Sequence, residues 1–244
     1  MQVIELRNYL FKEGGTGKFI RFFEEHFLFS QREEGMHVLG QFELVDDPDR
    51  FVWIRGFENM EARRRGLSGF YGGPFWQAHR AEANETMLEF HKVHLLRPLG
   101  PVAEMTGGLS LEDRALEPPG AVPAHTGLVV MDFYRSKPGA LGRLTEIFEQ
   151  RVQPALMAQG HQILGHLVAE MTPNDYPGLP VMQDPDLLVV LAAYRDAEHL
   201  EALRAEGKGS AHGELSMLLA AEVETIRLRP TAKSLIRYGG DGLP

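Results

Sequence analysis

The chain has 244 residues, 43% of them hydrophobic, which is typical of a folded protein with one large domain or two of ordinary size. Its formal net charge of −9 argues against a dedicated nucleic-acid binder or a binder of anionic membranes. The absence of cysteine excludes disulfides, thiolate nucleophiles and cysteine-based zinc sites. No apolar run reaches the roughly 20 residues of a membrane span, and strand-like sequence starts at Gln2, so we expect a cytoplasmic protein.

The predicted elements of residues 1–98 follow the order strand, helix, strand, strand, helix, strand. Within the later helical stretch, Asn59 is the expected N-cap, and Pro74, after Gly72-Gly73, suits the first turn of a second helix. This order is that of the ferredoxin-like β-α-β-β-α-β unit. The expected ranges are strands over 3–10, 36–44, 51–57 and 93–97, and helices over about 18–34 and within 60–87.

The second half of the chain repeats the first. An ungapped shift of 125 positions aligns Tyr9–Gly40 with Tyr134–Gly165. Two copies of one supersecondary unit are the simplest explanation, so we predict an α+β protein built from two tandem ferredoxin-like units. We expect a short strand at Ser234–Tyr238 and a glycine-rich end that frays. The predicted division is a first unit over 1–98, a linker over 99–124, a second, diverged unit over 125–230 and a tail over 231–244.

The two copies carry different side chains at matching positions. On the first predicted strand, period-two alternation puts Arg7 and Tyr9 on the same face as Glu5. The strand over 51–57 adds Trp53 and Arg55 in the same way. The second copy has Asp132 in place of Arg7, has Val190 and Ala192 in place of Trp53 and Arg55, and carries an insertion over 171–186. Only the first copy is therefore rich in charged and aromatic groups on this face.

Three segments, VIELRNY, DDPDRFVWIRGFENMEARR and FYGGPFWQAHRAEANETM, resemble the NIPSNAP family. The resemblance covers the first copy closely, through about Pro98, and the second more loosely. It implies the dimeric α+β barrel arrangement, in which two ferredoxin-like units close their sheets face to face. Because the family has no agreed enzymatic activity, the resemblance implies no reaction. It leaves open whether this barrel closes within one chain or between two chains, and a homodimer is possible.

The barrel arrangement suggests where each face of the strands points. We expect Ile4, Leu6, Val52 and Ile54 to lie under the helices. The opposite face, which carries Arg7, Tyr9, Trp53 and Arg55, would then line a cavity inside the barrel, with Glu5 and Asp132 as partners for the arginines.

Two interpretations of this cluster stay open. In the first, Arg7, Tyr9, Trp53, Arg55 and Asp132 bind a small anionic or aromatic ligand, because a guanidinium offers paired donors and an indole offers a flat wall. In the second, the same side chains form a structural salt-bridge network that binds nothing. A catalytic residue is not evident from the sequence. The candidate is His79, as a general base; the alternative is that His79 is a half-exposed histidine on an amphipathic helix with no catalytic role.

Two classes of function follow. One is a ligand-binding barrel, or an enzyme similar to the cofactor-independent monooxygenases and isomerases of the same fold group. The other is a non-catalytic scaffold that acts through protein contacts, marked by an exposed apolar patch around Phe70–Phe75. The histidine pairs His91/His94 and His161/His166 lack carboxylates at ligand spacing, so we expect no metal and no cofactor.

Overall fold

A computed structural model describes residues 1–205 and 210–239 of the chain. In its first half, the strands are ordered β4-β1-β3-β2 and all pairs are antiparallel, which is the ferredoxin-like arrangement. The elements of this half are β1 (Val3–Phe11), α1 (Gly15–Glu33), β2 (His37–Leu44), β3 (Arg50–Phe57), α2 (Met60–Gly72), α3 (Pro74–Asn84) and β4 (Met87–Pro98).

The second half has the same strand order, β8-β5-β7-β6. A short helix α4 (Val102–Met105) precedes it. Its first helical stretch is broken into α5, one π-helical turn at Phe148–Val152, and α6. The elements are β5 (Leu128–Arg135), α5 (Leu141–Ile147), α6 (Gln153–Ala158), β6 (Gln162–Ala169), β7 (Leu187–Tyr194), α7 (Ala197–Ala205), α8 (Ser210–Met217) and β8 (Glu224–Pro230).

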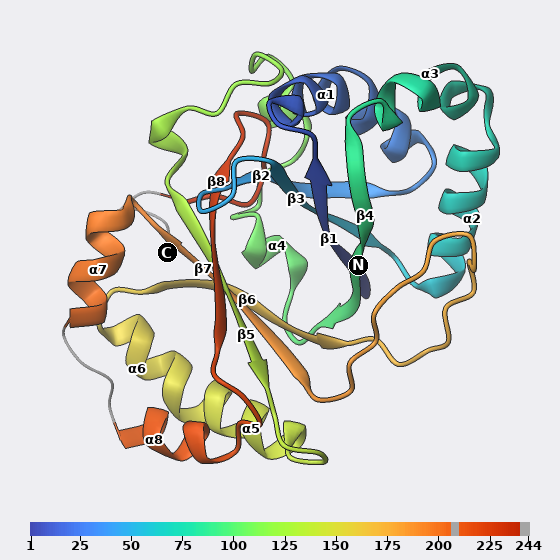
Figure 1. The fold of residues 1–244 in the computed structure, drawn as a ribbon. Helices are drawn as coiled ribbons and strands as arrows, with labels where there is room; N and C mark the ends of the chain where they lie inside the picture. The colour runs from blue at the N-terminus through green and yellow to red at the C-terminus, as the bar shows by residue number, and fades with distance from the viewer. Residues whose placement is uncertain (206–209, 240–244) are drawn as a thin grey trace.

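The two sheets join along both edges into one closed barrel (Figure 1). On one side β2 pairs with β8, and on the other β4 pairs with β6. The helices of each unit cover the outside of their own sheet. The predicted α+β fold of two ferredoxin-like units is therefore confirmed, and the barrel closes within a single chain. Closure satisfies the backbone groups that two separate sheets would leave exposed at their edges.

The prediction of which strand face points into the barrel was wrong. Ile4, Leu6, Val52 and Ile54 lie inside, in one buried apolar cluster with residues of β5 and β7 such as Val189. The charged and aromatic face lies outside, under α1, α2 and α3. Both faces of these strands are buried, so the alternation separates the two sets of side chains without indicating which set faces the barrel interior. The narrow interior takes mostly aliphatic side chains from both units, with Phe42 and Phe133 among them, whereas most of the first unit's aromatic rings pack against the phenylalanine-rich α1.

Segments outside the two units fill the rest of the interior. Val102 and Met105 of α4 lie in the interior cluster, and so does Ile236 of the C-terminal segment. That segment forms turns and bends, so the strand predicted at Ser234–Tyr238 is not present. Its backbone instead bonds to β2, where the N–H groups of Leu235 and Ile236 donate to the carbonyl of Leu39. The end predicted to fray, residues 240–244, lies outside the described residues.

Local signals in the sequence account for most element boundaries. The Asn59 side chain caps α2 by accepting a hydrogen bond from the backbone N–H of Ala62 at 2.9 Å, and Pro74 opens α3. Gly14 adopts the left-handed conformation before α1, which starts a turn earlier than predicted. β4 starts at Met87 rather than near residue 93. Across the described residues, none of the helices has the length and apolar character needed to span a bilayer.

Candidate functional site

A cavity of about 220 Å³ lies in the first unit, between the outer face of the sheet and its helices. Its floor is formed by Arg7 and Tyr9 of β1 and by Trp53 of β3, which all leave the strands on the outward face. The remaining lining is almost entirely apolar or aromatic and comes from α1, α2, α3, β4 and one loop: Phe19, Phe23, Phe27, Gln31, Phe70, Tyr71, Trp76, Ala83, Asn84, Met87, Phe90 and Leu179.

Beneath the floor, one buried carboxylate holds three arginines. Glu5 accepts hydrogen bonds from Arg7 Nη1 at 2.6 Å, from Arg55 Nε at 2.8 Å and from Arg63 Nε at 2.7 Å. Glu5, Arg55 and Arg63 are fully buried and Arg7 nearly so. The network extends from Arg55 Nη1 to the side-chain oxygen of Gln31 at 2.9 Å. Such a cluster persists in a core only when its charges are paired and hydrogen-bonded.

The cluster carries an excess of positive charge. Three guanidinium groups share two carboxylates, those of Glu5 and, at the edge, Asp175. Burial by itself would raise the pKa of Glu5, but Arg55, Arg7 and Arg63 together hold this pKa far below its usual range. Burial would lower the pKa of Arg7, and the neighbouring Tyr9 and Glu5 raise it instead. Glu5 is therefore ionised and fully engaged by the three arginines, so it is not left to act as a base.

Two residues that line the floor of the cavity, Trp53 and Arg7, carry hydrogen-bond donors that the described protein groups do not use. The Trp53 side chain is 2% exposed, and its indole Nε1–H finds no acceptor among the described residues. Arg7 donates through Nε to the Tyr9 hydroxyl at 2.7 Å and through Nη1 to Glu5, while Nη2 makes no hydrogen bond to a described residue. The guanidinium groups of Arg7 and Arg55 lie over the Trp53 ring, 5.3 and 5.1 Å from its centroid.

The second unit contributes a wall to this first-unit cavity. The insertion over residues 171–186 crosses to the other unit, where the backbone of Met182 bonds to Val93 and Leu95 of β4. Figure 1 shows this orange loop beside α2. Asn174 and Asp175 accept hydrogen bonds from Arg63 Nη1 at 3.0 and 3.2 Å. Further along, Leu179 lines the cavity and Tyr176 lies against Tyr71.

Sequence reasoning found the core of this cluster and misplaced its surroundings. Arg7, Tyr9, Trp53 and Arg55 are brought together as predicted, with Glu5 as their partner, but under the helices instead of inside the barrel. The predicted partner Asp132 lies on β5, on the opposite side of the barrel from β1, and its Oδ1 accepts a hydrogen bond from Thr225. The reason is again the face assignment: outward-facing side chains of opposite sheets cannot meet.

His79 does not line the cavity. Its ring stacks on His26 at 4.7 Å and lies 4.6 Å from Phe75, between α1 and α3. This placement gives no support to its predicted role as a base. The residues that the sequence analysis missed are Arg63, Gln31 and the 171–186 loop. The insertion itself was the signal for the loop, since an extra proline-rich segment in one copy needs a surface to cover.

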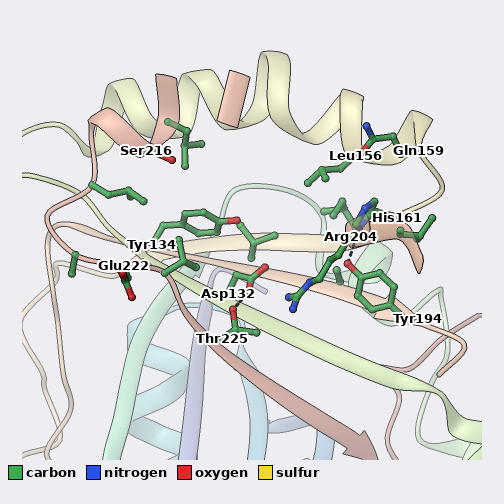
Figure 2. A pocket seen from close by; sticks show the side chains of 18 of the residues that line it. Asp132, Tyr134, Leu156, Gln159, His161, Tyr194, Arg204, Ser216, Glu222 and Thr225 are labelled. Atoms are coloured by element: carbon green, nitrogen blue, oxygen red, sulfur yellow. Dashed lines mark hydrogen bonds between the residues drawn. The ribbon is translucent and has the colours of Figure 1, made fainter. Parts of the chain in front are cut away.

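A second cavity occupies the equivalent place in the second unit (Figure 2). It has a volume of about 760 Å³ and lies between the outer face of β5, β6, β7 and β8 and the helices α6, α7 and α8. By strand pairing, Asp132 and Val190 stand opposite each other as Arg7 and Trp53 do in the first unit. The smaller side chains of the second unit leave this larger space. Among the described residues, no group of three His, Asp or Glu side chains is arranged to hold a metal ion.

No protein-family model and no curated protein matches the sequence. Solved structures do match. A candidate monooxygenase from Lactobacillus acidophilus aligns over 94% of this chain and 94% of its own, with 11% identity and a TM-score of 0.58. An anthrone oxidase-like protein aligns over 94% of this chain and 91% of its own, with 12% identity and a TM-score of 0.57. At these identities the likeness concerns the fold.

NIPSNAP proteins are also among the structural matches. A NIPSNAP family protein from Agrobacterium tumefaciens aligns over 46% of this chain and 93% of its own, with 18% identity and a TM-score of 0.37. That span has the length of one unit. NIPSNAP proteins, which the sequence resembles, are thus among the solved structures that match one unit's length of this chain.

Proposed function

We propose that the first-unit cavity binds a small organic anion with an aromatic or apolar body. The observation that carries this proposal is a pair of unused donors, Trp53 Nε1–H and Arg7 Nη2, on residues that line an otherwise apolar cavity. A buried donor without an acceptor, as the Trp53 N–H is, costs about 1–3 kcal/mol, and a ligand carboxylate or phenolate that accepted its hydrogen bond would remove that cost. The excess positive charge of the cluster favours an anion over a neutral group.

The size of the cavity supports a small ligand. Its 220 Å³ is below the roughly 300–1,000 Å³ of pockets that enclose drug-sized molecules. The edges and faces of Phe23, Phe27 and Trp76 suit the body of the ligand, because aromatic rings pack against one another in offset or edge-to-face contacts. An arylacetate or a compound of similar size fits this description.

A non-catalytic scaffold is less well supported. That hypothesis predicted an exposed apolar patch around Phe70–Phe75, but Phe70 is buried and Phe75 packs against Phe27 and Phe70. The barrel interior is filled with apolar side chains. The cavity between the first unit's sheet and its helices supports ligand binding instead of a scaffold role.

A second candidate function is cofactor-independent oxidation by O₂, in which an activated methylene becomes a carbonyl and water is the other product. Two of the structural neighbours carry names of that kind, a candidate monooxygenase and an anthrone oxidase-like protein. The donors of Arg7 and Trp53 would stabilise the enolate of such a substrate. The cavity lining offers no free carboxylate or histidine as a base, so only substrates that ionise by themselves near neutral pH would react. Oxygen consumption with such a substrate, compared with the R7M protein, tests this candidate.

Binding of phenylacetate, measured by calorimetry, tests the main proposal. Phenylacetamide is the matched neutral probe, since it keeps the ring and the shape and loses the charge. We expect phenylacetate to bind more tightly, and Arg7→Met to weaken it by about 10- to 150-fold, the value of one charge-assisted hydrogen bond of about 1.5–3 kcal/mol.

The control for this substitution is Arg64→Met, on the exposed surface of α2, which should leave binding unchanged. Arg7→Met keeps the volume of the arginine stem and leaves Glu5 paired with Arg55 and Arg63, so the protein should stay folded. Equal affinities for phenylacetate and phenylacetamide, or an R7M protein that binds phenylacetate as well as the wild type, would show that the cavity does not select an anion.

A further inference from the structure

The row of α1 side chains that lines the first-unit cavity ends in a polar residue. Phe19, Phe23, Phe27 and Gln31 follow one another at every fourth residue of α1, and all four line the cavity. This spacing keeps side chains on one side of a helix. Gln31 is 1% exposed, whereas glutamine usually lies at the surface. The 125-residue repeat places Leu156 at the equivalent position of the second unit, so the polar group belongs to the first unit alone.

Arg55 fixes the orientation of the Gln31 amide. Arg55 Nη1 donates a hydrogen bond to the side-chain oxygen of Gln31 at 2.9 Å. Because a guanidinium has donors and no acceptor, the amide must turn its oxygen, and not its nitrogen, toward Arg55. The two N–H groups of the amide nitrogen are left over, and neither donates to a described residue. Gln31 therefore brings a neutral donor of fixed orientation to a row that is otherwise apolar.

This amide adds to the unused donors of Arg7 and Trp53. The three residues lie close together: the guanidinium groups of Arg7 and Arg55 lie 5.3 and 5.1 Å from the centroid of the Trp53 ring, and Arg55 holds Gln31. All three residues line the cavity, and its lining contains no carboxylate or histidine. A ligand head group that satisfies such a set of donors offers several acceptors and no donor.

We propose that the first-unit cavity is selective for 2-oxo acids with an aromatic body, and that Gln31 recognises the keto oxygen. This inference rests on the anion site proposed above and narrows its ligand. Near neutral pH, the carboxylate and the adjacent keto group of a 2-oxo acid present three acceptor oxygens and no proton. The carboxylate then accepts from Arg7 and Trp53, and the keto oxygen accepts from the Gln31 amide. An arylacetate leaves the amide donor unused, and a 2-hydroxy acid adds a proton for which the lining has no carboxylate or histidine.

Three ligands that differ at a single carbon test the proposal on the wild-type protein. Beside its carboxylate, phenylacetate has a methylene, mandelate has a carbon that bears a hydroxyl, and benzoylformate has a ketone that cannot enolise. In calorimetric titrations near neutral pH, where all three are ionised, benzoylformate should bind about 3- to 10-fold more tightly than phenylacetate, the value of one hydrogen bond between neutral groups. Both mandelate enantiomers should bind more weakly than benzoylformate.

Gln31→Glu removes the amide donor and keeps an oxygen for Arg55, so the fold should hold. The added charge should weaken the binding of every anion, and the ratio of two affinities is therefore the measurement. In the Q31E protein the preference for benzoylformate over phenylacetate should vanish. The matched control is Gln77→Glu, which adds the same charge on the exposed surface of α3 and should leave the ratio unchanged.

The inference is wrong if the wild-type protein binds benzoylformate no better than phenylacetate, if mandelate binds as tightly as benzoylformate, or if Q31E keeps the preference. In each of these cases, phenylacetate that still binds more tightly than phenylacetamide would leave the anion site in place and overturn the keto-oxygen assignment alone. Binding of none of the anions would overturn both proposals.

Discussion

Replacing Glu5 with glutamine should destabilise the whole fold, because one carboxylate holds three buried arginines. Glu5 receives hydrogen bonds of 2.6, 2.8 and 2.7 Å from Arg7, Arg55 and Arg63, and its side chain is fully buried. Removing one partner of a buried ion pair costs about 3–5 kcal/mol, and here Arg7 and Arg55 lose their counter-charge together while Arg63 keeps only Asp175. We therefore expect a loss near the upper end, about 5 kcal/mol, out of the roughly 5–15 kcal/mol that stabilise an ordinary domain.

The assay is urea denaturation followed by circular dichroism. E5Q should strongly lower the urea concentration at the unfolding midpoint. It should leave the slope of the free energy of unfolding against urea concentration unchanged, since the same surface is exposed on unfolding. Glu61→Gln is the matched control, because Glu61 pairs with Arg64 on the exposed surface of α2 and should leave the midpoint where it is. An E5Q protein within about 1 kcal/mol of the wild type would refute the reasoning, since that is the size of an ordinary substitution.

Three further outcomes are expected. Folding lowers the pKa of the Glu5 carboxyl, so the stability that its ionised form provides is fully present above about pH 4.5, the pKa in the unfolded chain, and is lost as the pH falls from there toward the folded-state pKa. Acid denaturation should therefore be steep in the wild type and shallower in E5Q. Arg55→Met should cost about 1–3 kcal/mol of stability, because Gln31 loses its donor, yet leave phenylacetate binding unchanged because Arg55 does not line the cavity. Leu179→Trp should abolish phenylacetate binding without changing the melting temperature, because the larger side chain fills the cavity. Unchanged binding would show that the 171–186 loop is not a wall of the site.

The fold could be predicted because its signals are local. The alternation on β1 and β3, the capping side chain of Asn59 and the proline at the start of α3 each mark an element without help from distant residues. The sequence repeat at a shift of 125 positions is also visible in the irregularities of the strands. A bulge interrupts β2 between Val38 and Gly40, and another interrupts β6 between Ile163 and Gly165. At both glycines an added Cβ would come within 3 Å of a side chain that fills the barrel.

The surroundings of the site could not be predicted. They depend on which of the two buried strand faces points into the barrel and on contacts between the units. Trp53 and Arg55 alternate with Val52 and Ile54, and all four side chains are buried. The pattern is therefore compatible with either assignment, and the filling of the barrel by both units decides it. The contact of Asp175 with Arg63 joins residues 112 positions apart, and no periodicity signals it.

The most direct test of the anion site is the indole N–H resonance of Trp53 during a titration with phenylacetate. The protein has two tryptophans, so a ¹H–¹⁵N spectrum contains two indole signals, and Trp53→Phe assigns them. In the free protein this N–H has no acceptor among the described residues. If a ligand carboxylate accepts its hydrogen bond, the Trp53 signal should move downfield and saturate with phenylacetate, and phenylacetamide should move it less. A Trp53 signal that stays in place at saturating phenylacetate, or moves equally in the R7M protein, would contradict the account.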